Sequence, residues 1–302
     1  MKKTFGILIT LGLLFCIYNY RKPIINNTVN LFVKTKEIEV PEANIYKKDD
    51  AFLYVKDTNE FEPNNKEDIK NIFYTSINSG WDKFNFSCDK EYNDCINDVN
   101  SLSNNAIKLN QLNNFVHPYN SYHHIETITN NIGEVEININ KMYTSDMKLE
   151  IDIKINQIIN KVIKDTMTNR EKVKAIHDYI INNTKYDSKY TKTGKSNYSS
   201  NNAYGALIEG FAICGGYADA MALFLEIFDI KNYKIASNTH IWNYVKLDGK
   251  WYHLDLTWDD PVIKNSNKDR LEHTFFLITT KELEKLEKTQ HTYDKTVYLE
   301  AN

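Results

Sequence analysis

Three side chains that could together perform nucleophilic catalysis occur in order in the second half of the chain: Cys214, His240 and Asp255. Cys214 precedes Gly215 and an apolar run with helical spacing, so it is expected at the N-terminus of a buried helix. Unpaired backbone amides and the helix dipole favour a thiolate there and can bind an oxyanion. A cysteine without partners is more often a buried space-filling residue, so the other two residues decide the interpretation.

A β-hairpin is expected to bring the histidine and the aspartate together. The dipeptide Asp248-Gly249, typical of two-residue hairpin turns, separates two β-rich runs. The register of such a turn places His240 and Asp255 on one face as diagonal neighbours, about 7 to 8 Å apart in backbone terms. The carboxylate can then orient the imidazole for proton exchange with the sulfur. His253 lies on the same face, so alternation alone leaves either histidine as the base.

Composition limits the other classes of function. The chain has 302 residues, 42% hydrophobic and 25% charged, which is typical of a folded protein of one large or two small domains. A net charge of -3 without a basic cluster argues against a nucleic-acid partner. Three histidines lack the spacing of metal ligands: His117, His123 and His124. Neither a metal nor a cofactor is expected.

The N-terminus predicts a membrane partner. Two lysines precede an apolar stretch over residues 5–18, and no small-residue cleavage site follows it. We therefore expect a signal anchor over residues 1–20 and a polar linker or stalk over 21–64. The remainder would face the outside of the cell membrane, or would be secreted if the segment is cleaved.

An oxidising compartment changes the interpretation of the cysteines. Cys16 falls in the expected anchor, while Cys88 and Cys95 are close enough in sequence to form a short disulfide loop. Two unpaired structural thiols are the alternative. Either way Cys214 remains without an obvious partner, which makes it a candidate reactive group.

Two regions are expected beyond the linker. An N-terminal α+β region over 65–150 contains a helical pattern that stops at Gly80 and an alternating strand from Glu134. The segment from Ser145 looks helical only in its second half. A catalytic domain is expected over 151–302.

The second region opens with a helix that has a capping box, Thr168 to Glu171, and ends near Thr184. A further helix is expected to start at Cys214. An antiparallel sheet should contain residues 240–247 and 250–258.

Two segments, GFAICGGYADAMALFL and THIWNYVKLDGKWYHLDLTWDDP, resemble the transglutaminase-like superfamily, specifically its bacterial extracytoplasmic branch. The resemblance covers about residues 165–262. It implies an α+β fold with a papain/transglutaminase-like core, in which the helix carrying the cysteine packs on an antiparallel sheet carrying the histidine and the aspartate, preceded by an N-terminal α/β extension. Position by position, it implies Cys214 as nucleophile, His240 as base and Asp255 as the orienting acid.

Oxyanion and substrate-positioning roles are expected for residues near these three. The resemblance implies an upstream side chain beside the cysteine amide, for which Tyr204 is the candidate. Gly215 leaves room for a substrate backbone, and Trp242 is a candidate wall of the cleft. The function implied is an extracytoplasmic cysteine hydrolase that cleaves peptide or protein amide bonds at the cell surface. The alternatives are a transamidase that cross-links proteins and a non-catalytic module that binds a peptide or glycan.

Overall fold

The computed structural model describes residues 38–261 and 271–298. From Val40 onward they belong to one compact unit. The apolar stretch at residues 5–18, predicted as an anchor, lies outside the described residues. Within the described part of the chain, no helix has both the length and the apolar character needed to cross a membrane.

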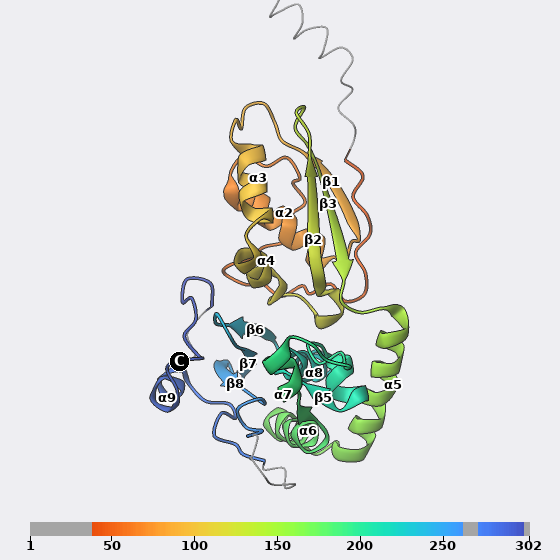
Figure 1. Cartoon of the computed structure of the whole chain (residues 1–302), viewed down its shortest axis with the longest axis vertical. Helices are drawn as coiled ribbons and strands as arrows, with labels where there is room; N and C mark the ends of the chain where they lie inside the picture. The colour runs from red at the N-terminus through yellow and green to blue at the C-terminus, as the bar shows by residue number, and fades with distance from the viewer. Residues whose placement is uncertain (1–37, 262–270, 299–302) are drawn as a thin grey trace, which may run out of the picture. The chain divides into compact units, whose positions relative to one another are not determined.

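The first half of the compact unit contains a three-stranded antiparallel sheet with the order β1-β3-β2, accompanied by three helices (Figure 1). Its elements are α2 (Lys66–Asn78), β1 (Lys83–Ser87), α3 (Cys95–Ser103), α4 (Ala106–Asn113), η1 (Pro118–Asn120), β2 (Tyr122–Thr129) and β3 (Glu134–Lys141). The chain leaves α2 through Gly80, whose φ of 69° favours glycine. A disulfide joins Cys88 and Cys95, with Cα atoms 5.7 Å apart.

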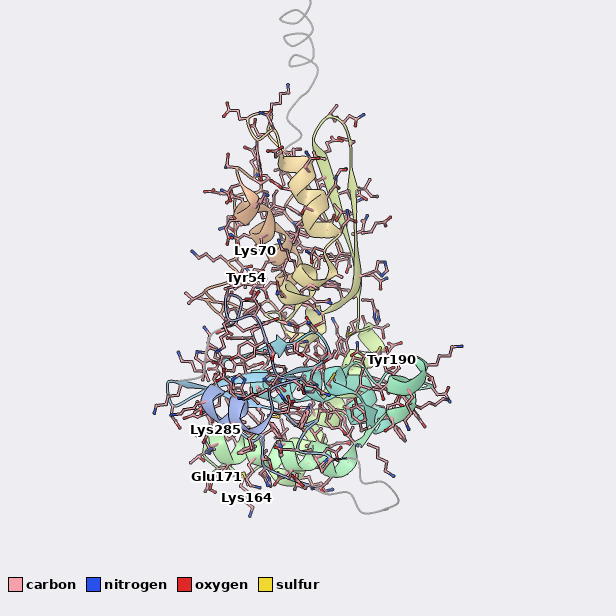
Figure 2. The ribbon with its side chains drawn as sticks, turned by 60° about the vertical axis from the view of Figure 1, so that its left-hand side comes forward. Tyr54, Lys70, Lys164, Glu171, Tyr190 and Lys285 are labelled. Carbon is pink, nitrogen blue, oxygen red and sulfur yellow. A yellow bond between two sulfur atoms is a disulfide. The ribbon has the colours of Figure 1, made fainter. Side chains whose placement is uncertain are left out.

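Residues 40–64 pack into this unit and do not form a stalk. Phe52 and Phe61 are each only 7% exposed. Lys48 is buried, and its Nζ donates to Glu226 Oε1 at 2.5 Å. Figure 2 shows Lys70 of α2 beside Tyr54, whose backbone oxygen accepts its Nζ at 2.5 Å. The segment predicted as a linker over 21–64 thus contains buried residues from Lys48 onward, while Val40, Ile45 and Leu53 are exposed.

Helix α5 (Ser145–Val162) is helical from its first turn, contrary to the expectation of a half-helical segment. Thr144 caps it, since its side chain accepts the Met147 amide at 3.2 Å. The buried residues Ile151, Ile155 and Ile158 recur at helical spacing. The predicted boundary between residues 150 and 151 consequently falls inside this helix.

The second half has the predicted α+β architecture. Helix α8, which begins at the cysteine, contacts strands β6 and β7 of an antiparallel sheet with the order β6-β7-β8, and β4 and β5 form a parallel pair (Figure 1). The elements are α6 (Asn169–Asn183), β4 (Lys185–Tyr186), α7 (Ser188–Thr193), the π-helix η2 (Gly205–Glu209), β5 (Phe211–Ala212), α8 (Cys214–Ile227), β6 (Asn232–Ala236), β7 (Ile241–Leu247), β8 (Lys250–Leu254) and α9 (Thr280–Leu286).

Local signals account for the elements that position the site. Helix α6 has its capping box, Thr168 with Glu171. The hairpin has the expected register, with Leu247 opposite Lys250. Strand β8 ends at Leu254, earlier than the predicted residue 258, because the side chain of the next residue accepts backbone amides and forms a turn.

Candidate active site

Cys214 is the first residue of α8, and its thiol is free. The helix is buried from Gly215 to Leu225, so packing on all sides fixes its N-terminus. Ile213 precedes the helix in extended conformation and provides no side-chain cap. The amides of Gly216 and Tyr217 donate to the Ile213 oxygen at 2.9 Å and 3.2 Å. The first amides of a helix have no intrahelical acceptor, so the N-terminus of α8 favours negative charge at the thiol.

His240 and Asp255 meet at the open end of the hairpin. His240 directly precedes β7 and Asp255 directly follows β8, and both are buried. His240 Nε2 lies 2.5 Å from Asp255 Oδ2. Cys214 lies close enough to the same imidazole to contribute to the raised pKa of His240. Because Nε2 faces the carboxylate, Nδ1 is the nitrogen left for the sulfur. The three residues predicted from the sequence are thus brought together in the order Cys214, His240, Asp255.

The surroundings of His240 favour its protonated form. Burial lowers the pKa of the imidazole, but the charge and hydrogen bond of Asp255, with a smaller contribution from Cys214, outweigh burial and raise it to about 10. For Asp255, burial would raise the pKa, yet the two facing histidines hold it well below its ordinary value. The arrangement therefore favours an imidazolium at His240 beside an ionised carboxylate at Asp255.

Asp255 is fixed by four donors. Its Oδ1 accepts the backbone amides of Thr257 at 2.9 Å and Trp258 at 3.2 Å. Its Oδ2 is shared by His240 at 2.5 Å and by His291 Nε2 at 2.8 Å. All its acceptor positions are used, so the carboxylate cannot rotate without losing hydrogen bonds.

Of the two histidines that strand alternation left open, the hydrogen bonds of His253 favour His240 as the candidate base. Its Nδ1 accepts from Trp242 Nε1 at 3.0 Å, and its Nε2 lies 3.1 Å from Thr280 Oγ1. Burial, with an additional contribution from the charge of His291, lowers its pKa to about 3, so the ring is neutral. Both of its nitrogens have partners other than Cys214.

Trp242 is 1% exposed and stacks on His240 with ring centroids 5.6 Å apart. Its N–H donates to His253, so the side chain supports the His240 ring from beneath and does not form the expected wall of the cleft. Tyr204 is not directed at the cysteine either, because its hydroxyl donates to Glu150 Oε2 at 2.9 Å on the surface of α5. The assignment of Tyr204 as an oxyanion donor is therefore not retained.

Gly215 and Gly216 leave room for the neighbouring loop that contains Ser200 and Asn201, whereas room for a substrate backbone was expected. A Cβ on Gly215 would lie 2.2 Å from Asn201 Oδ1, and one on Gly216 would lie 2.5 Å from the backbone oxygen of Ser200. The loop before η2 thus packs directly on the first turn of α8. This contact places the Asn201 carboxamide beside the turn that carries Cys214.

Three further side chains near these residues were not predicted from the sequence. Tyr186 of β4 is half-buried, and its pKa is raised by burial and then by the charge of Cys214. From the segment after α9, His291 Nε2 reaches Asp255, and Glu287 holds the other nitrogen of His291. Only the position of Tyr186, directly after the predicted helix, offered a sequence signal.

Among the residues that the structure describes, two groups of side chains bring potential metal-ligand atoms within 4.8 Å of one another: His177, Asp178 and His273, and His240, Asp255 and His291. Hydrogen bonds among these same atoms account for their proximity. In the first group, Lys174 Nζ also lies 2.6 Å from Asp178 Oδ2 and 2.9 Å from His273 Nε2. An ammonium group therefore already neutralises the carboxylate.

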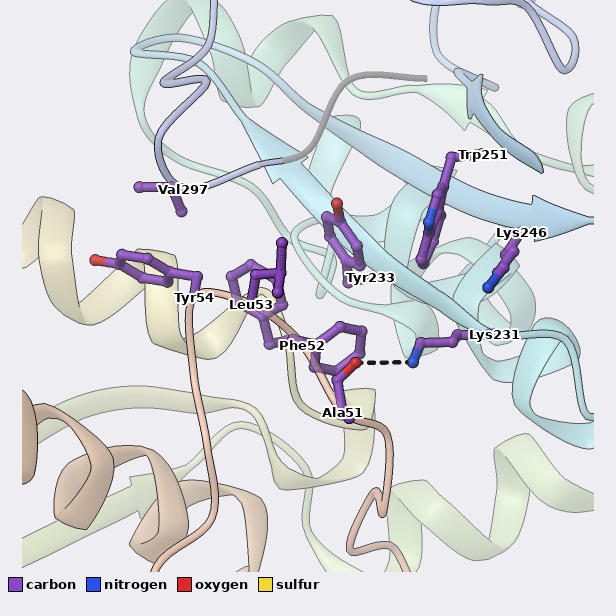
Figure 3. Close-up of a pocket in the computed structure, with 10 residues that line it drawn as sticks. Ala51, Phe52, Leu53, Tyr54, Lys231, Tyr233, Lys246, Trp251 and Val297 are labelled. Carbon is purple, nitrogen blue, oxygen red and sulfur yellow. Dashed lines mark hydrogen bonds between the residues drawn. The ribbon is translucent and has the colours of Figure 1, made fainter. Parts of the chain in front are cut away.

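A cavity of about 200 Å³ lies elsewhere, between the 51–54 segment and the β6–β8 sheet (Figure 3). Aromatic side chains line it, including Phe52, Tyr233 and Trp251, and Lys231 Nζ donates to the backbone oxygen of Ala51 at 2.9 Å. The triad residues are not among those that line it.

Comparison with known proteins identifies the domain. Residues 156–256, about a third of the chain, match the model of the transglutaminase-like superfamily, so the chain contains a transglutaminase-like domain. A search of curated proteins found no match.

Two solved structures are similar to part of the chain. One, described as a TGase, has 17% sequence identity and a TM-score of 0.36, and the match covers 56% of this chain and 50% of that one. The other, from Cytophaga hutchinsonii and described as a candidate cysteine protease, has 15% identity and a TM-score of 0.28, with 44% and 61% covered. The chain therefore spans about half to three fifths of the length of these structures.

Proposed function

We propose that the protein is an extracytoplasmic cysteine hydrolase that cleaves amide bonds of peptides or proteins through Cys214, His240 and Asp255. The observation that carries this proposal is the convergence of a helix-terminal thiol, a buried imidazole and a buried carboxylate. These are the parts of a nucleophile, base and orienting group.

The geometry supports a two-step reaction. The Cys214 thiolate attacks the amide carbon, and the carbonyl oxygen becomes an oxyanion beside the first-turn amides of α8. His240 then gives its proton to the leaving amine, so the C–N bond breaks and a thioester remains on Cys214. His240, now neutral, takes a proton from water, which attacks the thioester and releases the acid. Asp255 keeps the imidazole oriented throughout because Oδ2 holds Nε2.

Two features support an extracytoplasmic location. The two lysines and the apolar stretch at the N-terminus are typical of a signal anchor. The Cys88–Cys95 disulfide is of a kind that persists in oxidising compartments. On this proposal, the substrate is a peptide or protein at the cell surface.

The proposal can be tested with an unstructured protein such as casein. We expect new amino termini to appear with the wild-type protein and to be absent with Cys214→Ala. A fluorescent primary amine in the same reaction distinguishes the acceptors, since its attachment to casein would identify a transamidase instead. Cleavage that persists in Cys214→Ala would refute cysteine catalysis.

A further inference from the structure

A second histidine shares the carboxylate oxygen that orients His240. His291 Nε2 lies 2.8 Å from Asp255 Oδ2, the same oxygen that faces His240 Nε2 at 2.5 Å. His291 follows α9 and lies outside residues 156–256, the stretch that matches the superfamily model. Its contact with the triad is therefore a feature of this chain's C-terminal segment.

The other nitrogen of His291 is also held by a carboxylate. Nδ1 lies 2.9 Å from Glu287 Oε2. Burial would raise the pKa of Glu287, but hydrogen bonds from Thr289 and His291 outweigh it and lower the pKa to about 2, so this group is ionised. An ionised carboxylate only accepts hydrogen bonds. A ring between two carboxylates satisfies both only when it carries a proton on each nitrogen.

Aromatic packing holds the ring in this position. His291 is 4% exposed and stacks on Phe275 with ring centroids 5.3 Å apart. The ring centroids of Trp242 and Trp258 lie 4.8 Å and 5.3 Å from that of His291. Because water is excluded, the hydrogen bonds and charges in this chain of groups act more strongly than they would at the surface.

We propose that His291, held by Glu287, is a positioning residue for the cysteine chemistry: it fixes the Asp255 carboxylate and places a second positive charge beside it. This inference rests on the proposed function of Cys214 and His240. The charge partly neutralises Asp255, so His240 can release its proton to a leaving group as well as hold it. The same charge acts on the pair formed by Cys214 and His240, because the His291 and His240 ring centroids are only 5.1 Å apart.

The pH dependence of Cys214 alkylation by iodoacetamide tests the charge. The titratable groups that face His291 are Asp255, Glu287, His240 and His253. Removing a cation at this distance should move the acid limb of alkylation to higher pH by about one unit, so that alkylation on that limb becomes about tenfold slower. The rate is read from the mass of the Cys214 peptide.

Two variants separate charge from packing. His291→Gln keeps a donor for Asp255 without the charge, and His291→Phe keeps an aromatic ring without donor or charge. Both should show the shift, with a further loss of rate in His291→Phe. His124→Gln, at an exposed position in β2, should match the wild type. A purely structural role for His291 would leave the acid limb in place.

If neither variant folds, the protonation of His291 can be measured on the wild-type protein. Nitrogen-15 NMR of histidine-labelled protein should show His291 protonated on both nitrogens at neutral pH. A neutral His291, or an acid limb unchanged in the variants, would overturn the inference. If instead wild-type Cys214 is alkylated like an ordinary thiol, the proposed function itself fails.

Discussion

Replacing Asp255 by asparagine should abolish most activity while leaving the turn around it intact. The Asn oxygen can still accept the amides of Thr257 and Trp258 in place of Oδ1. The amide nitrogen then replaces Oδ2 and faces His240 Nε2 at the 2.5 Å contact. Two N–H groups cannot bond each other, so His240 must turn away or move its proton to Nδ1. A ring protonated at Nδ1 cannot accept the Cys214 proton.

The expected loss follows from this reversal. The same exchange in a serine-protease triad lowers kcat by about 10⁴-fold, which corresponds to about 5 kcal/mol of lost transition-state stabilisation. The structure gives a reason to expect a loss of that order. Without the carboxylate, only burial and the weaker influence of Cys214 act on His240, and burial lowers its pKa.

The assay is the rate of casein cleavage by purified Asp255→Asn, with circular dichroism as a check of folding. Asp248→Asn is the matched control, because it makes the same chemical change in the turn of the same hairpin. Asp248 has a φ of 51°, which asparagine also adopts readily. An Asp255→Asn protein that is folded and within tenfold of wild-type activity would refute the reasoning.

Three further predictions concern stability. Gly216→Ala should lower the free energy of unfolding by about 1 to 3 kcal/mol, because its Cβ would lie 2.5 Å from a backbone oxygen. Gly215→Ala should lower it less, since the Asn201 side chain that its Cβ would meet can move. Urea denaturation measures both variants, and equal losses would count against this packing. The raised pKa of His240 should stabilise the folded protein fully below about pH 6.5, and this contribution should be lost as pH rises through about 10. The measurement is Tm as a function of pH, and equal slopes for the wild type and Asp255→Asn would contradict the prediction. Replacing Cys88 and Cys95 by serine should lower the free energy of unfolding by about 2 kcal/mol without changing the rate of Cys214 alkylation. A changed alkylation rate would show that the disulfide loop influences the site.

The parts of the site that depend on local signals could be predicted. The Asp248-Gly249 turn sets the register of the hairpin, and the register determines which residues share a face. An apolar helix after Cys214 implies a buried N-terminus. The choice between His240 and His253 could not come from alternation, because it depends on hydrogen bonds between His253 and the side chains of Trp242 and Thr280, which only the folded chain brings together.

The parts that depend on distant packing were not predictable. His291 meets Asp255 across 36 positions of sequence, with no motif linking them. Asn201 reaches Gly215 only because a loop folds back onto α8. The first half of α5 alternates like a strand in sequence, yet the Thr144 cap and the burial of Ile151 determine that it is helical.

If Cys214 is an activated nucleophile paired with His240, the pH dependence of its alkylation rate should differ from that of an ordinary thiol. At pH 6 an ordinary thiol is only about 0.3% thiolate. We predict that wild-type Cys214 retains most of its maximal alkylation rate at that pH, and that His240→Gln loses this advantage. A wild-type rate that falls about tenfold for each pH unit below 8, as an ordinary thiol's does, would contradict the account.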